Sequence, residues 1–198
     1  MNISKHVLSK SLRAPLSTLR YCRWVVAGRP VPTPPAIKQR LVRRVAKTES
    51  VTILVETGTF MGDMLAANRY WFTRLVSIEL SEDLWERAKC RLGGISNITL
   101  LHGDSADLLP AVIAQLHEPA LFWLDAHYSA GITARANLET PIESELRTIL
   151  ATTQPGHLVL IDDARCFGQG DYPSLEAIRD LIAPRELVVE YDIIRFRV

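Results

Sequence analysis

Five short apolar segments, in which hydrophobic residues do not alternate with polar ones, constrain the fold of this chain most strongly. They are Thr52–Glu56, Leu75–Glu79, Ile98–His102, Ala120–Asp125 and His157–Asp162. Short segments rich in Val, Ile and Leu are typical of strands that are buried on both faces of a parallel sheet. Helical patterns fit between the segments. This alternation predicts an α/β fold with a Rossmann-like, doubly wound sheet.

Capping residues and apolar spacing predict where the helices lie. Ser81 is placed to cap one helix, and Thr140–Glu143 has the pattern of a capping box with proline at the first helical position. Leu175, Ile178 and Ile182 mark the apolar face of another helix. Residues 187–190 and 193–198 have the pattern of two antiparallel strands joined by a tight turn. We therefore expect a mostly parallel, seven-stranded sheet with an antiparallel C-terminal strand.

Charge is divided unevenly along the chain. Residues 1–47 contain eleven Lys and Arg and no Asp or Glu, which gives +11, whereas residues 48–198 contain twelve Lys and Arg and 22 Asp and Glu, which gives −10. The first region has broken helical spacing, then prolines, then a short amphipathic helical pattern. We expect a basic N-terminal helical arm with a proline-rich connector over residues 1–47 and an α/β domain over residues 48–198.

Composition excludes several classes of protein. With 47% hydrophobic and 23% charged residues, the 198-residue chain is typical of a globular domain. Its three cysteines lack the spacing of a disulfide framework or a zinc site. No apolar run reaches the roughly 18 residues of a spanning helix, and the start lacks a secretion signal. We expect a cytoplasmic protein; contact of residues 1–47 with the inner membrane face and homo-oligomer formation stay open.

The turn after the first strand is rich in glycine, and in open α/β sheets ligands bind at such strand ends. Gly58 and Gly62 allow a tight turn and a close approach of the backbone to a ligand. Phe60 stands where a dinucleotide-binding motif has its middle glycine, which disfavours a dinucleotide. Glu56 would repel phosphates and suits a cationic ligand. An ordinary strand-to-helix turn explains the same motif equally well.

The second and third strands also end in polar residues. Glu79 is placed to accept hydrogen bonds from both hydroxyls of a ribose, although an acid at a helix N-terminus is the alternative. Asp104 could accept from an exocyclic amine beside Ser105, or it could cap the next helix. The occurrence of such residues at three consecutive strand ends favours ligand binding over three separate structural roles.

Glu-x-Gly-x-x-x-Gly after the first strand, an acid after the second and Gly-Asp after the third resemble the class I S-adenosylmethionine-dependent methyltransferases. The resemblance covers about residues 50–198 and implies a methyltransferase domain over residues 48–198. It also implies that S-adenosylmethionine is bound by Glu56, Gly58 and Gly62 at its methionine part, by Glu79 at its ribose, and by Asp104 and Ser105 at its adenine.

The fourth and fifth strands end in Asp125 and in Asp162 with Asp163. Three converging carboxylates raise one another's pKa, and a divalent cation that prefers oxygen ligands, most simply Mg²⁺, resolves the conflict. Arg165, Arg135 or a cationic substrate could neutralise them instead. The pattern is similar to that of metal-dependent O-methyltransferases of the catechol and macrocin kind, which implies three metal ligands: Asp125, Asp162 and Asp163. Asp125 could also contact the methionine end of the cofactor.

The chain departs from the catechol-type enzymes at two positions. They have Asn where this chain has Asp163, and a catalytic lysine where it has Tyr128. No lysine follows Lys89, so we expect none near the three aspartates. His127 is the best substitute as general base, although a structural role for it is equally open. Polar residues of the following loop are expected to line the acceptor pocket: Tyr128, Thr133 and Arg135.

We therefore expect direct, metal-assisted transfer of a methyl group to a hydroxyl, with Asp125 and His127 as catalytic residues. The polar loop favours a sugar, a glycan or a small metabolite as acceptor. Two binding functions are the alternatives: a basic arm that binds nucleic acid, or one that lies on anionic lipid. A further interpretation is that the second helix of the arm covers the sheet and its basic face is only solvated. The acidic body, and the lack of an RNA-stacking aromatic motif, make nucleic acid an unexpected partner.

Overall fold

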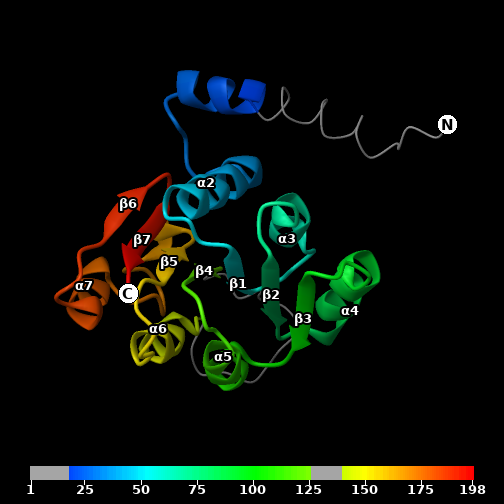
Figure 1. Ribbon diagram of the computed structural model, residues 1–198. Coiled ribbons are helices and arrows are strands. Elements are labelled where there is room, and N and C mark those ends of the chain that lie inside the picture. The colour runs from blue at the N-terminus through cyan, green and yellow to red at the C-terminus, as the bar shows by residue number, and fades with distance from the viewer. Residues whose placement is uncertain (1–17, 126–139) are drawn as a thin grey trace.

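The computed structural model describes residues 18–125 and 140–198 (Figure 1). Its centre is a seven-stranded sheet with the strand order β3-β2-β1-β4-β5-β7-β6. The strands are β1 (Ile53–Thr57), β2 (Arg74–Glu79), β3 (Ile98–His102), β4 (Ala120–Leu124), β5 (Leu158–Ile161), β6 (Val188–Glu190) and β7 (Ile193–Arg197). β1 to β5 are parallel, and β7 runs antiparallel to both β5 and β6. The predicted α/β architecture, including its antiparallel C-terminal strand, is confirmed.

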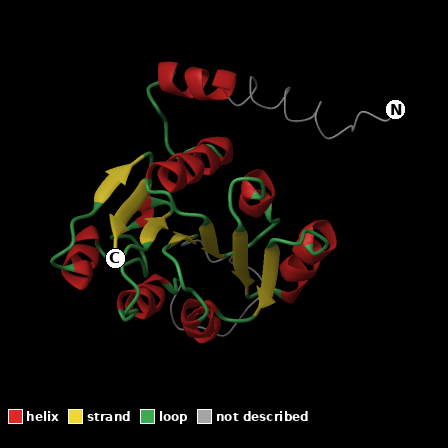
Figure 2. Cartoon of the chain, viewed as in Figure 1, coloured by secondary structure: helices red, strands yellow, loops and turns green. Residues whose placement is uncertain are grey.

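Helices cover both faces of the sheet (Figures 1 and 2). On one face lie α2 (Pro35–Thr48), α3 (Asp63–Asn68) and α4 (Glu82–Leu92); on the other lie α5 (Ser105–Ala114), α6 (Ile142–Leu150) and α7 (Leu175–Ile182). Residues 18–26 are also helical. Within the described part of the chain, no helix is long and apolar enough to cross a bilayer.

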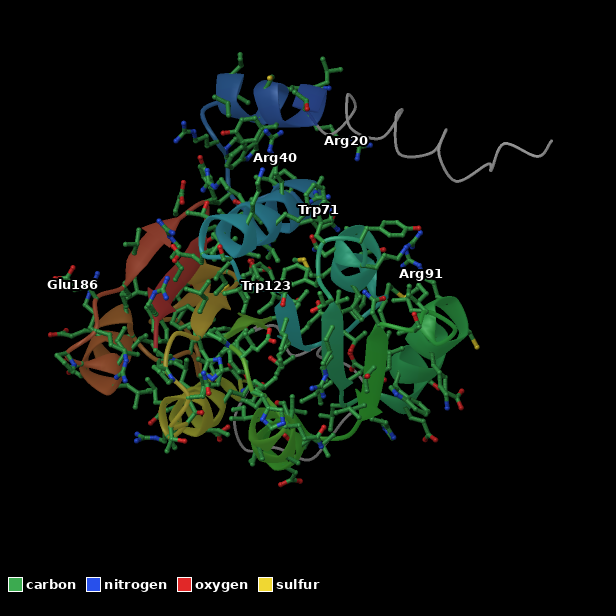
Figure 3. The ribbon with its side chains drawn as sticks, in the orientation of Figure 1. Arg20, Arg40, Trp71, Arg91, Trp123 and Glu186 are labelled. Atoms are coloured by element: carbon green, nitrogen blue, oxygen red, sulfur yellow. The ribbon has the colours of Figure 1, made fainter. Side chains whose placement is uncertain are left out.

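Neighbouring residues of each inner strand belong to two different cores. Leu54 and Trp123 pack in the core beneath α2, α3 and α4, whereas Val55 and Phe122 pack in the core beneath α5, α6 and α7. Trp123 lies inside the molecule in Figure 3. Because both faces of the sheet are covered, every position of β1, β4 and β5 is buried, which explains the lack of alternation in the sequence.

α2 belongs to the sheet's covering layer although it comes from the basic region. Its buried face includes Leu41, Val42 and Val45, which pack with the strands in one core. The helical segment 18–26 is attached through Trp24, whose ring meets that of Tyr191 edge-on at 5.1 Å. The proposed boundary after residue 47 falls one residue before the end of α2, and the division into two units stays a prediction.

α6 begins one residue later than the capping-box pattern predicts. Pro141 is the N-cap residue rather than the first helical residue. The Oγ1 atom of Thr140 accepts a hydrogen bond from the N–H of Ile142 at 3.4 Å. Glu143 does not complete the box, because its carboxylate accepts from Arg147 one turn further along, at 2.6 Å. Ser81 is the N-cap residue of α4, as expected, but its side chain makes no capping hydrogen bond.

Candidate active site

A cavity of about 290 Å³ opens at the carboxyl ends of β1, β2, β3 and β4. The strand order reverses between β1 and β4, and this is where open α/β sheets bind ligands. The structure brings together five of the predicted site residues in the cavity wall: Gly58, Glu79, Asp104, Ser105 and Asp125. Thr57 and Glu145, which the sequence analysis did not identify, also line it.

Glu79 is held by the backbone on both sides of its carboxylate. The Oε1 atom accepts a hydrogen bond from the N–H of Ser81 at 2.9 Å, and Oε2 accepts one from the N–H of Phe60 at 2.8 Å. Each carboxylate oxygen can accept a second hydrogen bond. The side chain is therefore fixed at the cavity wall while it retains the capacity to bind a pair of hydroxyl groups.

The two glycines of the turn after β1 have different surroundings. Gly58 has a φ of +83°, and a Cβ at this position would lie 3.2 Å from the Cβ of Asp125. Gly62 has a φ of +72° at the N-cap of α3, and a Cβ there would lie 2.6 Å from Cδ1 of Leu92 on α4. Gly58 borders the cavity, whereas Gly62 allows the turn to pack against α4. A contact of Gly62 with a cofactor stays a prediction.

Glu56 is buried behind the cavity wall. Its Oε2 accepts a hydrogen bond from the hydroxyl of Ser77 at 2.7 Å, and the hydroxyls of Ser77 and Thr59 are 2.6 Å apart. Burial raises the pKa of Glu56 well above its usual range; the Ser77 hydrogen bond opposes this rise and the nearby Asp125 carboxylate adds to it. A cation in the cavity would favour the ionised form of Glu56.

Asp104 and Ser105 both have partners within the protein. Asp104 caps α5 by accepting the N–H of Ala106 at 2.9 Å, so the helix-capping alternative is confirmed for a residue that also lines the cavity. The Ser105 hydroxyl donates to Oε1 of Glu145 at 2.5 Å. These contacts fix the wall of the cavity between α5 and α6.

Glu145 is a buried carboxyl that is only partly satisfied. Glu145 is 1% exposed, and burial raises the pKa of its carboxyl to about 7. In the described structure, neither its Oε2 atom nor Oγ1 of Thr57 has a hydrogen-bond partner. Both atoms are buried, and hydrogen bonding from the Thr57 hydroxyl opposes the rise in the pKa of Glu145, so these two side chains can pair with each other. The sequence signal for Glu145 was an acid within the buried face of α6.

Asp125, Asp162 and Asp163 converge as predicted. One carboxylate oxygen from each lies within 4.8 Å of the other two. Asp163 has a φ of 56°, and its N–H donates to Oδ1 of Asp162 at 2.8 Å. Aspartate tolerates this left-handed conformation better than most residues. The turn after β5 therefore directs two successive carboxylates toward Asp125.

The expectation that no lysine lies near these aspartates is wrong. The Nζ atom of Lys38, on α2, is 2.5 Å from Oδ2 of Asp162 and 3.1 Å from Oδ1 of Asp163. The Arg165 guanidinium also contacts Asp163 at 2.5 Å and forms an ion pair with Asp192. Neutralisation by Arg165, one of the alternatives to a metal, is thus present. The absence of lysine after Lys89 did not exclude this contact, because Lys38 comes from α2, 124 residues before Asp162.

These ion pairs affect the protonation of the cluster. Burial lowers the pKa of Lys38, but attraction to Asp162 and Asp163 outweighs this and raises the pKa above its usual value. Burial raises the pKa of Asp163, but its hydrogen bonds with Arg165 and Lys38 outweigh burial and lower it. Lys38 therefore carries its positive charge at neutral pH.

The three carboxylates are suitable ligands for Mg²⁺ by their chemistry. However, Lys38 already neutralises Asp162 and shares Asp163 with Arg165. A divalent ion that used all three aspartates would have to displace the ammonium from both of its partners. The arrangement does not fit a metal while Lys38 is in place.

Four of the predicted catalytic and acceptor-binding residues lie outside the described residues. They are His127, Tyr128, Thr133 and Arg135. Their roles stay predictions, and the acceptor side of the site is known only through the wall that Asp125 contributes to the cavity.

No family model and no curated protein matches this sequence. Its structure is similar to that of the O-methyltransferase TomG from Streptomyces achromogenes, involved in tomaymycin synthesis and bound to S-adenosylmethionine. The TM-score is 0.60 at 19% identity, covering 85% of this chain and 82% of that one.

Two further solved structures share the architecture. An O-methyltransferase from Bacillus cereus bound to S-adenosylhomocysteine has a TM-score of 0.61 at 16% identity, with 92% and 90% of the two chains covered. The N-methyltransferase NodS from Bradyrhizobium japonicum, bound to the same product, has a TM-score of 0.54 at 17% identity, with 81% and 85% covered. The chain therefore has the Rossmann-like fold of S-adenosylmethionine-dependent methyltransferases.

Proposed function

We propose that this protein is an S-adenosylmethionine-dependent methyltransferase whose cofactor occupies the cavity at the carboxyl ends of β1 to β4. The observation that carries the proposal is Glu79, a carboxylate held by two backbone N–H groups at the cavity wall. In sheets of this topology, an acid at the end of the second strand accepts hydrogen bonds from the ribose hydroxyls.

The acidic wall suits the positive charge of the cofactor's sulfonium. Glu79, Asp104, Asp125 and Glu145 line the cavity, and the buried carboxyl of Glu56 lies behind it. Attraction between opposite charges is strengthened where water is excluded. Asp104 lines the cavity and caps α5 through one oxygen, so its carboxylate keeps the capacity to accept the exocyclic amine of adenine.

The proposed reaction transfers a methyl group to an acceptor oxygen. When bound, the cofactor would supply its sulfonium methyl group and leave as S-adenosylhomocysteine, so that a carbon–oxygen bond replaces the sulfur–carbon bond while the acceptor hydroxyl gives up its proton. We assign the acceptance of that proton to His127 and the placement of the reacting groups to Asp125. Alignment of two reactants is worth up to about 7–11 kcal/mol when the geometry is ideal. The protein's main contribution is therefore to hold acceptor and methyl donor in line.

A hydroxyl on a sugar, a glycan or a small metabolite is the proposed acceptor. Two of the similar structures are O-methyltransferases, which favours oxygen, whereas NodS has the same fold and is an N-methyltransferase. Incubation with methyl-labelled S-adenosylmethionine and a panel of polyols, glycans, phenols and amines tests the acceptor. Label in a hydroxyl-bearing compound supports the proposal, and label confined to amines would contradict O-methylation.

Magnesium assistance, which the sequence led us to expect, is the competing account of the three aspartates. Their mutual distances favour it, but Lys38 and Arg165 already supply positive charge to two of them. We therefore propose methyl transfer without a metal at this position. The same assay, run with Mg²⁺ and with excess EDTA, separates the two accounts.

A second property, contact with an anionic membrane surface, is favoured by one group of residues beside α2. Tyr70 and Trp71 are 58% and 59% exposed, and the guanidinium of Arg43 lies 5.9 Å from the centre of the Trp71 ring. Figure 3 shows Trp71 on the side of the molecule that also carries Arg20 and Arg40. Exposed aromatic rings next to cations suit the headgroup region of anionic lipid.

A further inference from the structure

Lys38 is directed at the carboxylate cluster by the way α2 packs. Leu41 and Val42, three and four positions after Lys38, are buried beneath the helix. Residues at such spacings share one face of a helix. Lys38 therefore projects from the edge of the buried face, and its side chain is 13% exposed.

The carboxylates that Lys38 contacts are even less accessible to water. The side chains of Asp162 and Asp163 are 5% and 7% exposed. The oxygen of Asp162 that does not bind Lys38 accepts the N–H of Asp163, and Asp163 also binds Arg165. Buried charges must be paired, because water no longer solvates them. Lys38 is the cation that serves Asp162 in the described structure.

We infer that the ammonium of Lys38 is the resident cation of the Asp125–Asp162–Asp163 cluster and occupies the place that a divalent metal would need. The basic N-terminal region then completes the active site: α2 supplies the positive charge that holds Asp162 and Asp163 in place beside Asp125. The metal-binding part of this inference is independent of the proposed function; only its consequence for turnover rests on methyl transfer.

The inference has a consequence for metal affinity that does not depend on activity. With Lys38 in place, a divalent ion must displace an ammonium from two buried partners. Removing the ammonium leaves Asp162 without its cation beside two further carboxylates, one of which Arg165 still neutralises, and such a group of oxygens attracts a hard cation. Loss of the positive charge at residue 38 should therefore create a metal site in a protein that otherwise lacks one.

The test is titration of the full-length protein with Mn²⁺, following free Mn²⁺ by electron paramagnetic resonance at neutral pH. We expect no stoichiometric binding by the wild type and an apparent affinity at least about tenfold higher for Lys38→Met. Addition of Asp162→Asn to Lys38→Met should abolish the gain. Lys47→Met is the matched control, because Lys47 is exposed on the same helix and its loss changes net charge equally. Lys38→Arg, which keeps the charge, should behave like the wild type.

Stoichiometric Mn²⁺ binding by the wild type that is lost in Asp162→Asn would overturn the inference, as would a folded Lys38→Met protein that gains no Mn²⁺ site. Circular dichroism establishes whether each variant is folded. If Lys38→Met is unfolded, the titration of the wild type and of Asp162→Asn alone tests the inference. Binding of S-adenosylhomocysteine is measured separately. A protein that binds neither this compound nor Mn²⁺ contradicts the proposed function and leaves the inference about Lys38 standing.

Discussion

Lys38 on α2 and Asp162 after β5 are 124 residues apart in the sequence, yet their Nζ and Oδ2 atoms lie 2.5 Å apart. This contact joins the basic region, residues 1–47, to the acidic strand ends of residues 48–198. It gives one of the eleven N-terminal cations a specific partner and makes α2 a part of the site as well as a part of the core.

Lys38→Met should destabilise the protein, because it leaves Asp162 buried without its cation. Breaking a buried ion pair by removing one partner costs about 3–5 kcal/mol, but burial raises the pKa of Asp162 to about 7 even beside Lys38, so the carboxyl can take up a proton and the expected value is at or below the lower end. Urea unfolding at pH 7 measures this cost. The exposed Lys47→Met should change the free energy of unfolding by less than about 0.5 kcal/mol. Equal effects of the two substitutions would contradict a buried pair.

Gly62→Ala should destabilise the protein by about 1–3 kcal/mol, because the new methyl group overlaps the side chain of Leu92 and the backbone φ is +72°. Gly94→Ala is the control, since a Cβ there has no neighbour within 4 Å. At a temperature where the Gly62→Ala protein is folded, an affinity for S-adenosylhomocysteine equal to that of the wild type would show that Gly62 acts through packing alone. A large loss of affinity without loss of stability would place Gly62 at the cofactor instead.

Glu145 should make the ligand-free protein less stable as the pH rises. Its pKa is raised from 4.5 to about 7 in the folded state, so ionisation costs more there than in the unfolded chain. The folded state is therefore stabilised, relative to high pH, while Glu145 is protonated in both states, below about pH 4.5. This stabilisation is lost as the pH rises through 7, and a shift of this size corresponds to about 3 kcal/mol in the free energy of unfolding.

Glu145→Gln removes this loss while it keeps an oxygen that can accept from Ser105. Its free energy of unfolding, relative to the wild type, should therefore increase between pH 5.5 and pH 8.5. Urea unfolding at the two pH values gives the difference, and the exposed Glu143→Gln on the same helix serves as control. An unchanged difference between wild type and Glu145→Gln would show that Glu145 does not titrate in this range.

The exposed aromatic pair can be tested with vesicles. Trp71→Ser should reduce co-sedimentation with vesicles that contain phosphatidylserine, because it removes an exposed ring flanked by Arg43. Val188→Ser, at another exposed apolar residue, should have no effect. Equal binding of wild-type protein to neutral and anionic vesicles, or no binding to either, would rule out the electrostatic contact.

The sequence was sufficient to predict the sheet and the positions of its strand ends. Leu54 and Val55 show why: a strand with apolar residues on both faces must be covered on both faces, and helices between the strands provide the cover. Convergence of Asp125 with Asp162 followed from the same topology, because adjacent parallel strands end at the same edge.

The partners of those carboxylates could not be predicted in the same way. Lys38 lies in a helix whose basic residues all look alike in sequence, and only the packing of α2 distinguishes it from exposed Lys47. Glu145 has the spacing of a buried position, but an acid in a helix is usually exposed. The capping box predicted at the start of α6 is incomplete, because Arg147 binds the carboxylate of Glu143. Each error involves a long-range contact or a competition between partners.

Calorimetric titration with S-adenosylhomocysteine tests the central claim most directly. The wild type should bind one molecule per chain, and Glu79→Ala, which removes two hydrogen bonds to the ribose, should weaken binding by about 1–3 kcal/mol. Glu82→Ala, at an acidic residue of the first turn of α4 that does not line the cavity, should bind like the wild type. Binding of NAD in place of both S-adenosylmethionine and S-adenosylhomocysteine, or equal affinity of Glu79→Ala and wild type, would contradict the assignment of this cavity to the methyl donor.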